Sequence, residues 1–223
     1  GNGNQASQAT AMAQPTLGRM PAGGRRNLLT GTEDASTWAD FGVSVFNEPD
    51  YILALQGDIA SRNSIGGKGS LSIFNGVSTV RIIEVKQTDP NTKYVAAGTR
   101  TNYTWFDLDN KDWLFEVTYP QLFIASRHFE LLDDGWVRLI TVQEYTGAGS
   151  AATERYLYFR DTLPSTDSSD PGAGSNTYSL GLRRPMAFFP SEPILAKDVG
   201  NPYQRVGRSG FDVTEDGAQS LSY

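Results

Sequence analysis

Short β-type runs separated by turn residues constrain the fold of this chain most. From Asn27 onward, Val, Ile, Thr, Tyr, Phe and Trp gather in short segments that Gly, Asn, Asp and Pro interrupt. STVRIIEVKQ (78–87) and GWVRLITVQEY (135–145) alternate polar and apolar residues, as half-buried antiparallel strands do, and no segment carries a long apolar stripe at helical spacing. The expected strands are 43–46, 51–56, 69–74, 79–87, 94–101, 113–119, 122–126, 136–145, 155–160 and 178–188.

About ten short strands in about 200 residues predict an all-β fold, an antiparallel β-sandwich and most simply a jelly roll. Turn sequences at 88–93, 108–112 and 133–135 separate the strands, and 161–177 is a long polar loop. Strand 136–145 carries large apolar residues on both faces. We therefore expect a central strand with Trp136 buried.

The first 24 residues differ in composition from the rest. They are small, polar and rich in Gly, Ala and Gln, and they contain no aromatic residue. We expect residues 1–26 to form an extended arm that has no core of its own and lies on another protein. A simple disordered tail is the alternative.

Composition weighs against several classes of function. A net charge of −6 without a long run of one sign argues against nucleic acid as the main partner. No stretch approaches the roughly 20 apolar residues of a membrane span, so no membrane insertion is expected. With no cysteine and one histidine, His128, a Cys–His nucleophile pair and a multi-histidine metal centre are impossible.

Four acidic pairs invite comparison with glycosidase carboxylates. Adjacent acids on a strand point to opposite faces, so they are poorly placed to flank one bond, and we interpret the pairs as turn and surface acids. A dyad of acids distant in sequence stays open. The pairs are Glu33/Asp34, Asp107/Asp109, Asp133/Asp134 and Glu215/Asp216.

Two further short motifs have ordinary interpretations. SIGGKGS (64–70) is Gly-rich but lacks the spacing of a phosphate-binding loop, and we interpret it as a flexible turn. NYT (102–104) matches the N-glycosylation acceptor, a pattern that arises often by chance.

Aromatic residues offer a candidate binding surface in NYTWFDLDN (102–110). Strand alternation places Tyr103, Trp105 and Asp107 on one face. Flat rings stack on the apolar faces of sugars, and a neighbouring carboxylate accepts hydrogen bonds from hydroxyls. The face is a candidate sugar platform if Trp105 is exposed; the alternative is that Trp105 is a core residue.

Several segments together resemble carbohydrate-binding-module-like jelly rolls in virion proteins of tailed bacteriophages. RRNLLTGTEDASTWADFGVSV (25–45) is similar to their opening, although Ala35 replaces the usual aromatic residue. DGWVRLITV (134–142) resembles a strand of those domains, and NPYQRV (201–206) resembles their closing segment. The matching residues of the opening are Asn27, Leu28, Leu29, Glu33, Asp34, Ser36, Trp38, Gly42, Val43 and Val45.

The resemblance implies a domain organisation and a possible metal. It implies a jelly roll over 27–206 and a linker over 207–223 toward a further β-domain, with the arm 1–26 attaching the chain to other virion proteins. Jelly rolls of this kind often hold a structural calcium near the chain ends. Glu33 or Asp34 would supply oxygen ligands suited to that ion, and no other cofactor is implied.

The implied function is that of a non-enzymatic virion component, located in a tail fibre, tail spike or head fibre. It would attach the particle to a host-surface glycan, as a homotrimer whose multivalency compensates for weak single sites. One alternative is a structural adaptor or decoration module without sugar binding. A third is a polysaccharide depolymerase.

Overall fold

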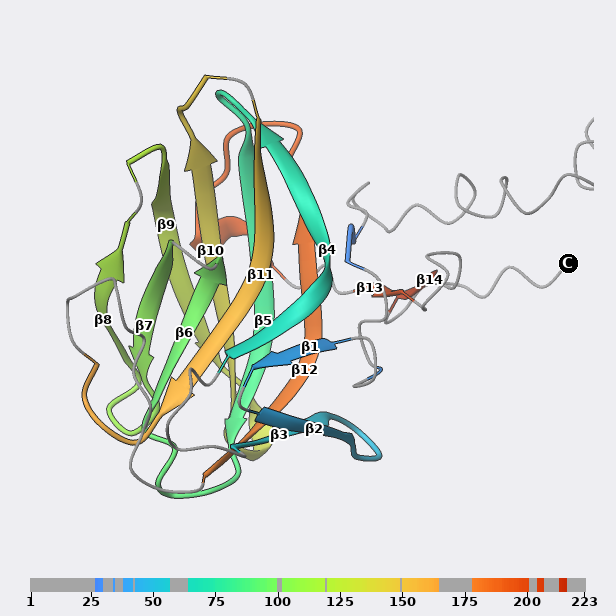
Figure 1. Ribbon diagram of the computed structural model, residues 1–223, viewed down its shortest axis with the longest axis vertical. Helices are drawn as coiled ribbons and strands as arrows, with labels where there is room; N and C mark the ends of the chain where they lie inside the picture. The colour runs from blue at the N-terminus through green and yellow to red at the C-terminus, as the bar shows by residue number, and fades with distance from the viewer. Residues whose placement is uncertain are drawn as a thin grey trace, which may run out of the picture.

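Two antiparallel sheets of six strands each pack face to face in the computed structural model (Figure 1). The structure describes residues 27–29, 34, 38–41, 43–56, 64–99, 102–118, 120–148, 150–164, 178–200, 204–206 and 213–215. The predicted all-β sandwich is confirmed. The expected arm, 1–26, lies outside the described residues, as does most of 207–223.

The two sheets have these strands in spatial order. Sheet A contains β1 (Trp38–Phe41), β4 (Ser64–Phe74), β11 (Ser150–Arg160), β6 (Tyr94–Thr99), β7 (Tyr103–Asp107) and β8 (Asp112–Val117). Sheet B contains β2 (Val43–Asn47), β3 (Ile52–Gln56), β12 (Ser179–Phe188), β5 (Ser78–Gln87), β10 (Trp136–Tyr145) and β9 (Leu122–Leu131). A separate ladder pairs β13 (Gln204–Val206) with β14 (Val213–Glu215), so a short strand lies within the expected linker.

The order of eight strands is that of a jelly roll. Along the chain, β4, β5 and β6 alternate between the sheets, and β10, β11 and β12 do the same. The second set inserts into the first, with β11 between β4 and β6 and β12 between β3 and β5. The resulting four-stranded units, β4-β11-β6-β7 and β3-β12-β5-β10, are two interlocked Greek keys. Strands β1, β2, β8 and β9 widen the sheets at their edges.

Alternation along the strands divides the apolar residues between two layers. On β10, Val137 and Leu139 point into the main core between the sheets, whereas Ile140 and Val142 point to the outer face of sheet B. The 3-10 turn η3 (Ala196–Asp198) and the residues beside it cover that outer face. β10 also lies between β5 and β9, so the prediction of a central strand covered on both sides is confirmed. Trp136 is 5% exposed.

The expected strands are all present, with shifted ends. The clearest correction concerns 64–70, which forms the first half of β4 rather than a flexible turn. Gly66 and Gly67 pair with β1 on one side and with β11 on the other, so the backbone has ladder partners on both edges. The predicted turn at 133–135 is present as the 3-10 turn η2 (Asp133–Gly135), in which Asp134 and Gly135 both have positive φ angles.

Asn27 fastens the start of the domain to β12. The ladder between β12 and β3 ends at Leu182, and the register of β12 against β5 shifts between Arg183 and Met186. Beyond that shift, the Asn27 side chain accepts a hydrogen bond from the Ala187 N–H (3.0 Å) and donates one to the Pro185 carbonyl (2.9 Å). The backbone N–H of Leu28 donates to the Ala187 carbonyl. The start of the resembling segment therefore completes an edge of sheet B.

We expect Asn27→Ala to lower the free energy of unfolding by about 1–3 kcal/mol, because it leaves the Ala187 N–H unsatisfied at a buried position. Chemical denaturation measures the change. Asn91→Ala is the matched control, since Asn91 is exposed in a turn and its loss should change stability by less than about 0.5 kcal/mol. Equal effects of the two variants would contradict the role of Asn27.

Candidate functional site

The expected sugar platform on β7 is buried. Tyr103, Trp105 and Asp107 are 2%, 1% and 6% exposed. Tyr103 contacts Trp105 edge-on at 6.0 Å between ring centroids and Tyr158 at 4.9 Å. Tyr103, Trp105 and Tyr158 belong, together with Ala96, to an apolar cluster on the side of sheet A opposite to the main core. The prediction of an exposed platform here is wrong, and the alternative, a buried Trp105, holds.

Asp107 is used by the turn that follows it. Its Oδ1 atom accepts the backbone N–H groups of Asp109 and Asn110, each at 2.9 Å, and its Oδ2 atom accepts the Asn110 side-chain amide at 2.9 Å. The Asp107 carboxylate therefore stabilises the β7–β8 turn.

The same carboxylate affects a neighbouring tyrosine. Burial raises the pKa of Tyr94, and the charges of Asp107 and Asp109 raise it further.

We expect Trp105→Ala to lower the free energy of unfolding by about 3–5 kcal/mol, since it removes a fully buried indole. Thermal and chemical denaturation measure the loss. Phe74→Ala is the control, because Phe74 is 56% exposed and its removal should cost less than about 0.5 kcal/mol. A Trp105→Ala variant that melts like the wild type would contradict the assignment.

The predicted calcium ligands are only partly described. Glu33 lies outside the described residues, and Asp34 is half-buried. Among the residues with described positions, no group of three or more His, Cys, Asp or Glu side chains is placed to hold a metal. Calcium near Glu33 and Asp34 stays a prediction.

Asn102, the asparagine of the NYT motif, is a structural residue with 0% exposure. Its side-chain amide donates to the Leu122 carbonyl (2.8 Å), and its Oδ1 atom accepts from Gln143 (2.9 Å). These bonds tie the β6–β7 turn to sheet B. A glycan would not fit at this position of the folded chain.

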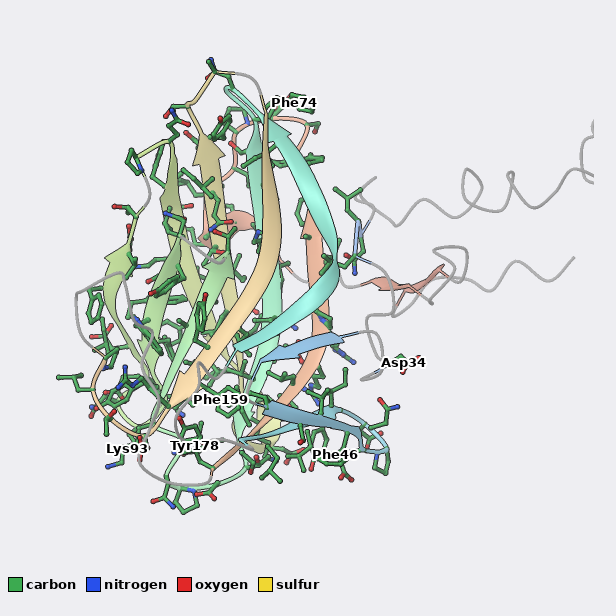
Figure 2. The ribbon with its side chains drawn as sticks, viewed as in Figure 1. Asp34, Phe46, Phe74, Lys93, Phe159 and Tyr178 are labelled. Atoms are coloured by element: carbon green, nitrogen blue, oxygen red, sulfur yellow. The ribbon has the colours of Figure 1, made fainter. Side chains whose placement is uncertain are left out.

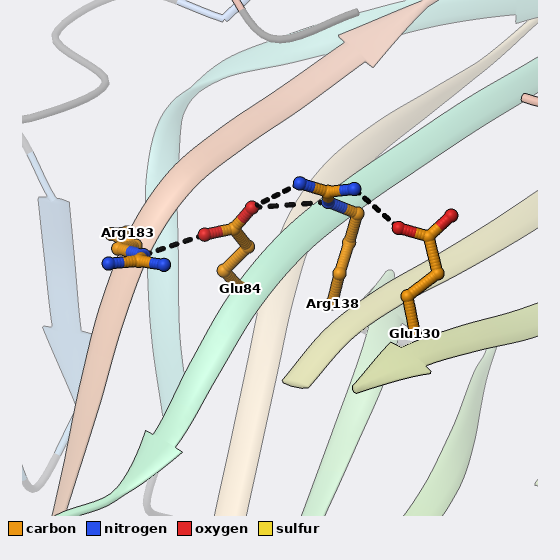
Figure 3. A network of polar contacts seen from close by, with 4 residues as sticks. All are labelled: Glu84, Glu130, Arg138 and Arg183. Atoms are coloured by element: carbon orange, nitrogen blue, oxygen red, sulfur yellow. Dashed lines mark hydrogen bonds and ion pairs between the residues drawn. The ribbon is translucent and has the colours of Figure 1, made fainter. Parts of the chain in front are cut away.

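A chain of ion pairs crosses four strands on the outer face of sheet B (Figure 3). Arg138 on β10 donates from Nε (3.1 Å) and Nη2 (2.7 Å) to Oε1 of Glu84 on β5. Arg183 on β12 donates from Nε to Oε2 of Glu84 at 2.6 Å, and Arg138 also pairs with Glu130 on β9. Glu84 has 1% side-chain exposure, against 26% for Arg183 and 30% for Glu130. The network is deepest at Glu84 and opens to solvent at both ends.

Trp136 lies beside this network, and two cationic side chains, those of Arg183 and Lys86, lie over its indole ring. The Arg183 guanidinium carbon is 4.1 Å from the Trp136 ring centroid, and the Lys86 ammonium nitrogen is 6.0 Å from it. The ring of Tyr51 meets the indole edge-on at 5.8 Å between centroids. A Cβ at Gly181 would lie 3.4 Å from the Trp136 Cη2 atom, which is an ordinary van der Waals contact, so the indole reaches across to β12 at this glycine. We call Tyr51, Lys86, Trp136 and Arg183 the Trp136 surface.

Sequence reasoning missed this surface, although two signals were available. Alternation in 78–87 places Glu84 and Lys86 on the same face as Ile82, and the resembling segment 134–142 contains both Trp136 and Arg138. Arg183 had no comparable signal, because its position depends on the pairing of β12 with β5, which are about 100 residues apart in the chain.

A second polar cluster lies between the sheets, on the inner face of β5 and β10. Arg81 and Thr141 are cross-strand neighbours, as are Thr79 and Gln143, and all four are buried. Burial lowers the pKa of Arg81 to about 10. Arg81 and Thr141 line a cavity of about 20 Å³, which is room for about one water molecule. The cavity is too small for a sugar.

We expect Glu84→Ala to lower the free energy of unfolding by about 3–5 kcal/mol, because it leaves the buried Arg138 guanidinium without its main partner. Glu130→Ala is the matched control at the solvent-exposed end of the same network and should cost about 1 kcal/mol or less. Urea denaturation of both variants measures the difference. Similar losses would show that Glu84 is not the centre of the network.

No family model matches this chain, and no curated protein matches it. In the part of the chain that the structure describes, no helix is long and apolar enough to cross a membrane.

Proposed function

We propose that this chain is a non-enzymatic component of a tailed phage or phage-like particle, in its tail or head fibre. Its jelly roll is a carbohydrate-binding-type domain that attaches the particle to a glycan of the host surface. The arm 1–26 joins it to other virion proteins, and a trimeric fibre presents several copies to the cell.

The observation that carries the proposal is where the resembling segments fall in the fold. Asn27 of the opening segment completes the edge of β12, and Trp136 and Arg138 of the second segment lie on the outer face of sheet B. The third segment contains β13. The three resembling segments, which are far apart in the sequence, thus each contain residues of the described fold. That fold is the jelly roll that the resemblance implies.

The Trp136 surface is the better candidate for glycan contact, because its donors are partly exposed, whereas the three β7 residues are buried. The Trp136 indole is only 5% exposed, but the Arg183 side chain is 26% exposed, and Lys86 and the Tyr51 ring are half-buried. An aromatic ring beside hydrogen-bond donors suits a sugar ring. Exposed apolar residues adjoin it at the edge of the sheet, since Phe46 pairs with Leu53 and Leu53 pairs with Gly181. Phe46 is 49% exposed and projects from the β2–β3 hairpin (Figure 2).

A structural adaptor without sugar binding is the second candidate. The observation in its favour is that the aromatic cluster around Trp105 is buried, so those rings contribute to the fold rather than to a platform. In this alternative the jelly roll positions neighbouring fibre segments, and the Trp136 surface is part of the framework.

Competition for adsorption tests the proposal. Antibodies raised against the purified full chain should label intact particles. The purified chain itself should slow adsorption of the particles to cells of the strain that they infect. The reason is that the free chain occupies the surface glycan. The Trp105→Ala chain, if it is unfolded at the assay temperature, serves as a negative control. Labelled particles whose adsorption is unchanged by excess chain would favour the adaptor.

A further inference from the structure

We propose that the Trp136 surface binds an acidic saccharide, with Arg183 and Lys86 holding the carboxylate of a uronic acid unit. The inference rests on the proposed function and names the class of its ligand. It is carried by the arrangement of Arg183, Lys86 and Tyr51 around the indole.

Arg183 is held in place while keeping donors available. Its Nε atom donates to Oε2 of Glu84, and its guanidinium lies over the Trp136 ring, so two contacts fix the plane of the group. Within the described part of the chain, the Nη1 and Nη2 atoms make no hydrogen bond, and the side chain is 26% exposed. A guanidinium presents its donors as a planar fork that matches a carboxylate. Prior fixation reduces the entropy that binding would cost.

Lys86 on β5 and Tyr51, which directly precedes β3, both contact the Trp136 indole. Lys86 is the cross-strand partner of both Trp136 and Gly181, and it is half-buried. Neither the Lys86 ammonium group nor the Tyr51 hydroxyl has a hydrogen bond or ion pair among the described residues. The Arg183 guanidinium carbon, the Lys86 ammonium nitrogen and the Tyr51 ring centroid thus all lie within 6.0 Å of the Trp136 ring centroid.

The network itself is neutral, with two guanidinium groups and two carboxylates, and Lys86 adds one further cation beside Trp136. Glu84 accepts from two guanidinium groups, and Glu130 pairs with Arg138, so both acids of the network are already engaged. Lys86 and Arg183 therefore stand beside Trp136 as the cationic end of a chain whose net charge is −6. A local cationic site on an acidic protein selects an anion by contact, because the field of the whole protein does not attract one.

The apolar surroundings favour an acid carried by a sugar ring. The Tyr51 ring and the side chains of Leu53 and Phe46 continue the surface away from Arg183 toward the sheet edge. A pyranose ring has an apolar face that suits such a surface, with its hydroxyls reaching the solvent boundary. A uronic acid joins this face to a planar carboxylate in one unit.

Titration of the full chain with trigalacturonic acid tests the inference. The methyl ester of the same trisaccharide is the uncharged ligand control, and NMR of the Trp136 indole N–H gives a local readout. The acid should bind at least tenfold more tightly than the ester. Lys86→Gln and Arg183→Gln should each weaken binding of the acid about tenfold, as expected for the loss of a charge-assisted contact. Lys197→Gln, an exposed lysine in η3, should leave affinity unchanged.

The outcomes separate this inference from the proposed function. Equal binding of acid and ester, or acid binding that Lys86→Gln and Arg183→Gln both leave intact, would overturn the inference while sugar binding stands. Failure to bind any saccharide on an array of host-surface glycans would overturn the proposed function itself. Lys86 contacts no buried carboxylate, so Lys86→Gln keeps the test valid if Arg183→Gln lowers the melting temperature.

Discussion

Burial of both faces of β5 and β10 is the constraint on which the rest of this structure depends. The inner faces of these strands pack against sheet A, and the outer faces lie under η3 and among the side chains of neighbouring strands. A polar side chain on either face must then find a partner within the protein, because an unpaired buried charge costs several kcal/mol. Glu84, between two guanidinium groups, is the result on the outer face. On the inner face, Arg81 and Thr141 line a cavity with room for about one water.

The ion-pair network combines a buried centre with partly solvated ends on the outer face of sheet B. The centre of the network, Glu84, is shielded from solvent, so removing its carboxylate leaves the buried Arg138 guanidinium without its main partner. The ends of the network, Glu130 and Arg183, are partly solvated. Solvated ends contribute little to stability. They can therefore change contacts, or accept a ligand, at small cost to the fold. A gradient of burial along one network separates the residue that holds the sheet from the residue available for binding.

The fold was predictable from local patterns, and the candidate site was not. Alternation within single segments identified most strands and placed Trp136 in a covered central strand. The error at 64–70 arose because glycines were interpreted from their turn propensity, whereas pairing with β1 and β11 decides the structure there. Trp105 shows the other limit: alternation gives the face of a strand but not whether that face is covered. The Trp136 surface depends on β3, β12, β5 and β10 becoming neighbours, which no short segment encodes.

The residues that carry the family resemblance and the residues proposed to choose the ligand are different sets. Asn27 and Arg138 are engaged by the chain itself, the first with the edge of β12 and the second with Glu84 and Glu130. A sequence pattern built on such residues marks a way of closing a jelly roll. Lys86, Tyr51 and Arg183 lie outside the resembling segments and keep donors that the fold does not use. Under the proposed function, ligand preference can then change at Lys86 and Tyr51 while the framework persists. A substitution such as Lys86→Gln alters the charge that a ligand meets, whereas a change at Arg183 also removes a partner from the buried Glu84 carboxylate.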